Sequence, residues 1–137
     1  MSDANKAALR RFLDEGFNKG NQGAIDEMIA DSFVDHSPPP GVPGNKAGVK
    51  QIVQMFRAAF PDLRVTVEDV IADGDKVAVR MVTRGTHKGD LMGVAPTGKT
   101  VTVNEQHWVR FANGKAVEHW GVEDNLGMMQ QLGVVQM

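Results

Sequence analysis

The side chains best suited to proton-transfer chemistry lie in one stretch of alternating residues. Every second residue of a strand points to the same face, and one face of this stretch carries Val101, Val103, Glu105, His107, Val109 and Phe111. It is the more apolar of the two faces, so we assign it to the interior, with Glu105 and His107 side by side. A carboxylate beside an imidazole orients the ring and favours its protonated form, which suits a general acid or base. The alternative is a satisfied polar pair within the sheet or at a subunit interface.

The last predicted strand, 115–123, carries a second set of candidates. His119 and Trp120 fall on opposite faces of it, and neither face is cleanly apolar, so alternation does not decide which one enters the interior. Asp124 follows this strand. A carboxylate beside an apolar pocket can exchange protons near neutral pH, whereas the alternative for Asp124 is the N-cap of a terminal helix.

The two remaining histidines are weaker candidates. His36 follows a short apolar segment, and it either projects into the open end of a pocket or lies in a surface loop. His87 sits in a turn-rich segment, where we favour a structural or solvent-exposed role. The spacing of the four histidines is not that of common helical zinc sites, and no glycine-rich phosphate loop opens a helix. We therefore expect neither a metal site nor a nucleotide site.

Hydrophobic periodicity predicts helices in the first half of the chain and strands in the second. Apolar residues at helical spacing predict a helix from Ser2 or Asp3 to about Asn18–Gly20, a short helix over Gly23–Ala30, and a third over Lys46–Ala59. A short strand within 32–37 and a proline-rich loop over 38–44 precede the third helix. Alternating residues then predict strands near 63–68, 77–85, 101–111 and 115–123, with a short terminal helix over 125–132.

This order predicts an α+β fold in which a curved antiparallel sheet wraps over three N-terminal helices. Such a sheet encloses a cavity, and we expect that cavity to be an apolar pocket for a hydrophobic small molecule. The length fits a single domain, residues 1–137,.

The charge and the residue composition of the chain exclude several classes of function. The formal net charge is -2, with basic residues scattered, so we expect no nucleic-acid partner and no membrane partner,. Cysteine is absent, which excludes thiolate catalysis, and tyrosine is absent too. Since the N-terminal residues lack the apolar segment of a signal peptide, we expect a cytoplasmic location.

Along nearly its whole length the chain resembles the SnoaL-like polyketide cyclases, or ester cyclases, of the nuclear transport factor two and ketosteroid isomerase superfamily. The resemblance rests on short motifs in a fixed order: Phe33–Pro38, Phe60–Leu63, Asp69–Val77, Arg84–His87, Gly93–Gly98, Asn113–Lys115, Glu118–Trp120, Asp124–Gly127 and Gln131–Gly133. The chain departs from many of these relatives at one point, because Gly121 stands where they have an aspartate directly after the tryptophan.

The resemblance implies a conical α+β barrel, a homodimer, a deep apolar pocket and no cofactor. The implied reaction is an aldol cyclisation or a related isomerisation of a hydrophobic, polyketide-like carbonyl compound. In this interpretation Asp124 is the acid/base, His107 polarises the enolate, Glu105 orients His107, and His36 lies near the base of ketosteroid isomerases. The residues expected to contact substrate are Trp120, His119, Phe56, Val109 and Phe17.

Two other functions remain open from the sequence. One is a non-catalytic binding protein for a hydrophobic ligand. The other is an epoxide-type hydrolase, in which Glu105 and His107 activate a water molecule.

Overall fold

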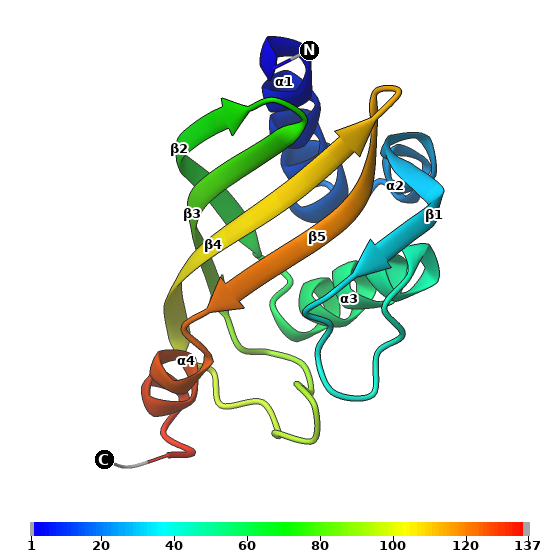
Figure 1. The fold of residues 1–137 in the computed structure, drawn as a ribbon. Coiled ribbons are helices and arrows are strands. Elements are labelled where there is room, and N and C mark those ends of the chain that lie inside the picture. Colours follow the sequence, from blue (N-terminus) through cyan, green and yellow to red (C-terminus); the bar gives the residue numbers. More distant parts are fainter. Residues whose placement is uncertain (1, 136–137) are drawn as a thin grey trace.

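The computed structural model describes residues 2–135, and Figure 1 shows helices covering one face of a curved, unclosed sheet. The α+β class is as predicted. Its elements are α1 (Ser2–Phe12), the π-helix η1 (Leu13–Asn18), α2 (Gln22–Met28), β1 (Ile29–Asp35), α3 (Lys46–Ala59), β2 (Arg64–Asp73), β3 (Lys76–Thr86), β4 (Thr100–Ala112), β5 (Lys115–Glu123) and α4 (Asn125–Leu132).

The first helix runs directly into the π-helix, whose end is held by side chains from other elements. Asn18 donates to and accepts from the backbone of Val65 at 3.1 and 2.6 Å. Arg57 donates to the carbonyl oxygens of Phe17 and Asn18 at 2.7 and 2.8 Å, which satisfies groups that a helix end leaves unpaired,. Within residues 2–135 no helix is long and apolar enough to cross a membrane.

The sheet order is β1-β5-β4-β3-β2. The four long strands pair antiparallel, as predicted. The short strand β1 pairs parallel with β5, so the sheet is mixed rather than wholly antiparallel. This corrects the prediction, which had no local signal for a pairing between segments more than 80 residues apart in the chain.

A bulge in β5 changes which residues face inward. Val109 pairs with His119 but Phe111 pairs with Ala116, so β5 has one residue more than β4 across this interval,. Both Ala116 and His119 therefore line the inner side, although three positions separate them. The bulge is the reason that simple alternation along 115–123 could not assign a face.

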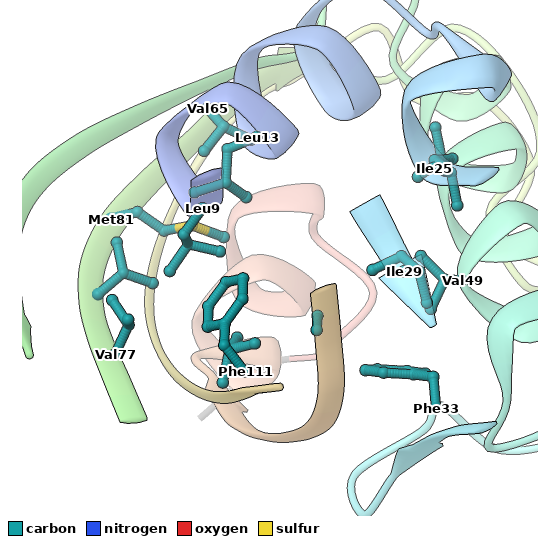
Figure 2. Packing of buried hydrophobic residues seen from close by; sticks show 14 residues of the cluster. Leu9, Leu13, Ile25, Ile29, Phe33, Val49, Val65, Val77, Met81 and Phe111 are labelled. Atoms are coloured by element: carbon teal, nitrogen blue, oxygen red, sulfur yellow. The ribbon is translucent and has the colours of Figure 1, made fainter. Parts of the chain in front are cut away.

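The core lies between the N-terminal helices and the concave face of the sheet. Figure 2 shows Leu9 and Leu13 directed toward Met81, Val77 and Phe111 of the strands. A second cluster, which includes Phe60, Val101 and Met128, packs α4 against the start of β4. Figure 1 shows the loops after β1 and β3 at the same end of the sheet as α4.

Candidate active site

The helices and the concave face of the sheet enclose a pocket of about 470 Å³. Most of its wall is apolar: Leu9, Phe12, Leu13, Phe17, Ile52, Phe56, Val79, Met81, Val103 and Val109, with Pro38–Pro40 and Met92 from the loops. Among the described residues, five titratable side chains line it: Asp35, Glu105, His107, His119 and Glu123. A largely apolar pocket with a few converging polar groups is the usual form of a small-molecule site.

Strand register brings these five side chains together. Asp35 of β1 pairs with His119 of β5. One strand further, His107 of β4 lies opposite Gly121, and Glu105 lies opposite Glu123. The polar groups therefore form one strip across β1, β5 and β4, at the edge of an otherwise apolar wall.

Four of them are joined in a continuous row of hydrogen bonds. Oδ1 of Asp35 lies 2.8 Å from Nδ1 of His119. Nε2 of His119 lies 2.7 Å from Nδ1 of His107, whose Nε2 lies 2.9 Å from Oε1 of Glu105. All four side chains are mostly buried, with exposed fractions between 6% and 18%. We call this row the Asp35–Glu105 string.

Asp35 is held as a carboxylate. Burial alone would raise its pKa, but the hydrogen bond from His119 and another from the backbone N–H of Ser37 outweigh burial and hold the pKa below its usual value,. The Ser37 N–H donates to Oδ1 at 2.9 Å. The Ser37 hydroxyl in turn accepts from the N–H of Gly121 at 3.2 Å, which ties the end of β1 to β5.

Glu123 stands beside the string without joining it. A carboxylate oxygen of Glu123 lies within 4.8 Å of ligand-type atoms of both Glu105 and His107. The string uses other groups, so the Glu123 carboxylate is open to a molecule in the pocket. It is therefore positioned to accept a proton from such a molecule.

Gly121 leaves the space in which the two imidazole rings meet. A β-carbon at this position would lie 2.9 Å from Nε2 of His119 and closer still to Nδ1 of His107. The rings stack with centroids 5.0 Å apart and an interplanar angle of 27°. Any side chain at position 121 must therefore displace one of the rings.

Several residues singled out from the sequence lie where the pattern predicted. Glu105 and His107 point inward from β4 and line the pocket. Phe56, Val109 and Phe17, three of the candidate substrate contacts, also line the pocket. So does His119, whose face alternation had left undecided.

Asp124 is not among the residues that line the pocket. Its Oδ1 accepts a hydrogen bond from the N–H of Gly127 at 2.9 Å, and it forms the N-cap of α4. The N-cap alternative is thus confirmed, and the expected place of Asp124 in the pocket is wrong. The inward carboxylate at this end of the strand is its neighbour, Glu123.

His36 and Trp120 also lie outside the pocket lining. Their rings stack at 4.8 Å, and Nε2 of His36 lies 2.8 Å from Glu118. Hydrogen bonds from His36 and Arg110 lower the pKa of Glu118. His36 therefore does not project into the pocket, and Trp120 does not line it as expected. Both side chains share the opposite face of the sheet with Trp108, which pairs with Trp120 in the ladder.

His87 has the structural role that we favoured, and it is fully buried rather than solvent-exposed. Its Nδ1 accepts a hydrogen bond from the N–H of Thr97 at 3.2 Å, and its ring packs near Phe60. It anchors the loop between β3 and β4.

Sequence reasoning missed Asp35 and Glu123 as site residues. Asp35 belongs to one of the motifs that carried the resemblance, but its partner His119 is 84 positions away. The signal for Glu123 was available, since it shares the alternation of His119 along β5. The prediction chose the adjacent carboxylate, Asp124, in place of Glu123.

Glu105, His107 and Glu123 are the one group of histidine and acidic side chains in residues 2–135 close enough to surround a cation. However, Nε2 of His107 is already engaged with Glu105 at a hydrogen-bond distance of 2.9 Å. A cation would have to displace this contact, so the arrangement is that of a proton-sharing pair.

Comparison with known proteins identifies the family. The model of the SnoaL-like polyketide cyclases matches residues 7–132. The chain belongs to this family. Among curated relatives, aklanonic acid methyl ester cyclase AcmA of Streptomyces galilaeus is 26% identical over 93% of this chain and 89% of its own length. Nogalonic acid methyl ester cyclase of Streptomyces nogalater is 28% identical over 85% of this chain and 89% of its own length.

Solved structures agree with this assignment. The wild-type IdmH structure from Streptomyces antibioticus is 38% identical, with a TM-score of 0.82 over 95% of this chain and 99% of that one. The SnoaL-like chain described here thus shares its fold with proteins that differ from it at most positions.

Proposed function

We propose that this SnoaL-like protein is a cofactor-free acid–base enzyme that closes or isomerises a hydrophobic carbonyl compound of polyketide type. The observation that carries the proposal is the strip of Glu105, His107 and Glu123 at the edge of an apolar pocket. Acid–base groups in a water-poor, preorganised cavity are suited to enolate chemistry.

The reaction is an intramolecular aldol addition. Glu123 takes a proton from the carbon next to a carbonyl group, and the negative charge of the resulting enolate is stabilised by the proton that the neighbouring His107–Glu105 pair holds. The enolate carbon then forms a bond to a second carbonyl carbon, whose oxygen takes up a proton from the His107–Glu105 pair. One proton is removed and one is returned, so no oxidant or co-reactant is needed.

The names of the relatives suggest the first compounds to test. AcmA and the nogalonic acid enzyme are methyl ester cyclases, and a pocket of about 470 Å³ is within the size range of small-molecule sites,. The experiment is to incubate the protein with aklanonic acid methyl ester and separately with nogalonic acid methyl ester, in D₂O. Cyclised product supports the proposal. Deuterium in the recovered ester, at the carbon next to the carbonyl, also supports it, because an enolate that does not close takes up solvent deuterium at that carbon.

A result in which the ester binds, but neither product nor deuterium exchange appears, would instead favour a binding protein. Incorporation of an oxygen atom from solvent water into the product would favour the epoxide-type hydrolase.

We further propose that the protein acts as a homodimer through the outer face of its sheet. A row of residues in register crosses four strands on this face: Ile71, Ala78, Trp108 and Trp120. Ile71 and Trp108 are 65% and 56% exposed. The rows on either side are polar, with Arg80 in one and the paired Arg110 and Glu118 in the other, so charged side chains border the apolar row on which a second copy related by a two-fold axis would pack,.

We also propose a cytoplasmic location. The cysteine-free composition fits a compartment in which disulfides do not form,. Fractionation of the producing cells would test this.

A further inference from the structure

We propose that Asp35, His119, His107 and Glu105 work as one unit that holds a single transferable proton, and that the absence of a side chain at Gly121 makes the unit possible. The inference rests on the proposed function for its catalytic use, but the proton itself follows from hydrogen-bond geometry alone.

The count of protons is fixed by the contacts. The string contains three hydrogen bonds, and each requires one proton between its two heavy atoms. Two neutral imidazoles supply one N–H each, and ionised carboxylates supply none. Three bonds therefore need one proton more than the state in which both rings are neutral and both carboxylates are ionised.

Because Asp35 is held as a carboxylate, this additional proton can occupy three positions. It can reside on Glu105 as a carboxylic acid, on His107 as an imidazolium, or on His119 as an imidazolium. The three forms interconvert when protons shift along hydrogen bonds that already exist, with no change in heavy-atom positions. Such tightly linked groups titrate as a unit rather than as separate residues.

The two ends of the string differ. Asp35 accepts a second hydrogen bond from the Ser37 N–H, and its pKa is lowered, so this end stays ionised. Glu105 faces the pocket beside Glu123. The proton is therefore held toward the pocket end, where a substrate oxygen can receive it. Asp35 and His119 act through His107, so we regard them as positioning residues.

The string also restores the site after each cycle. When Glu105 or His107 gives a proton to the new alkoxide, Glu123 holds the proton taken from carbon. Glu105 and Glu123 face each other across β4 and β5, and their oxygens lie within 4.8 Å. The proton can pass back between them, directly or through one water molecule. Among the described pocket residues, no other titratable side chain is available for this step.

Gly121 is the structural condition for the string. A β-carbon there would overlap the contact between Nδ1 of His107 and Nε2 of His119. Gly121→Ala should therefore break the middle hydrogen bond while leaving the four string residues present. Val122→Ala is the matched control, because this neighbouring side chain on β5 is 74% exposed and points away from the pocket.

The test is a pH titration of the ¹⁵N-labelled imidazole rings by nuclear magnetic resonance. In the native protein and in Val122→Ala, we expect the His107 and His119 nitrogens to shift with one shared midpoint. In Gly121→Ala the two rings should titrate with separate midpoints. Asp35→Asn should move the shared midpoint, since it replaces a charge at one end. Folding of each variant is checked from its backbone amide spectrum.

The inference is overturned if the native rings already titrate with separate midpoints, or if Gly121→Ala leaves a shared midpoint unchanged. This readout needs no substrate. A protein that keeps the shared midpoint but turns over neither methyl ester would contradict the proposed function and leave the string intact as a finding. A protein that cyclises the ester with independent rings would contradict the string alone.

Discussion

Gly121 lies directly opposite His107 in the β4–β5 ladder, and the space of its missing side chain is where the rings of His107 and His119 meet. One backbone position thus decides whether the polar groups of the pocket form a connected row.

Glu123→Gln should reduce the rate of cyclisation by about 10²–10⁴-fold, because it removes the proposed proton acceptor while preserving the shape of the side chain. Binding of the ester should change little. The measurement is kcat by chromatography, alongside a binding titration. Retention of more than half the native rate would remove Glu123 from this role.

Asp124→Ala should behave in the opposite way. It deletes the N-cap of α4, which costs about 1 kcal/mol of the free energy of unfolding,. Since Asp124 is absent from the pocket lining, kcat should stay near the native value. Urea denaturation and the same cyclisation assay, run on the native protein and both variants, separate the two effects. A steep loss of kcat without loss of stability would restore Asp124 as the acid/base.

Asp35 should make the folded state sensitive to acid. Its pKa is lower folded than unfolded, so it contributes stability above its unfolded value of about 3.9, and this contribution is lost as pH falls through the folded value,. Asp35→Asn lacks that dependence. We expect the urea midpoints of the native protein and of Asp35→Asn to converge as the pH is lowered from 6 by about a few units. Parallel curves would show that Asp35 carries no such stabilisation.

Trp108→Lys should convert a dimer into monomers, because it places a charge in the centre of the exposed row on the outer sheet face. Leu126→Lys is the control, since Leu126 is comparably exposed, at 51%, but lies on α4. Sedimentation velocity distinguishes the species. Equal sedimentation of the native protein and Trp108→Lys would argue against this interface.

Extended treatment with a metal chelator should leave the cyclisation rate unchanged. Nε2 of His107 is engaged with Glu105 and needs no cation to fix it. Added Zn²⁺ should slow the reaction by competing for Glu105, His107 and Glu123,. A rate that falls with the chelator and recovers with metal would contradict the proposed mechanism.

The helices and the long strands could be predicted because their signals are local. The third helix runs from Lys46 to Ala59, as its apolar spacing predicted. The inward direction of Glu105 and His107 followed from alternation along a strand that pairs regularly on one side. In both cases neighbouring residues contain the information.

The rest depended on contacts between distant segments. Asp35 joins the site only because β1 adds to the sheet edge beside β5, a pairing that no local pattern encodes. His119 faces inward through a bulge, which interrupts the alternation on which the prediction relied. Asp124 had two plausible roles, and the hydrogen bond to Gly127 decided between them.

The bulge in β5 also divides that strand into two parts with different evolutionary freedom. Residues before it, such as Ala116, are fixed by the packed core, whereas His119, Gly121 and Glu123 beyond it supply the polar strip. With one residue fewer at the bulge, Ala116 and His119 would be two positions apart, and simple alternation would still direct both of them inward,. Loss of a single codon at the bulge would therefore preserve both the polar strip and the packed core in a descendant gene.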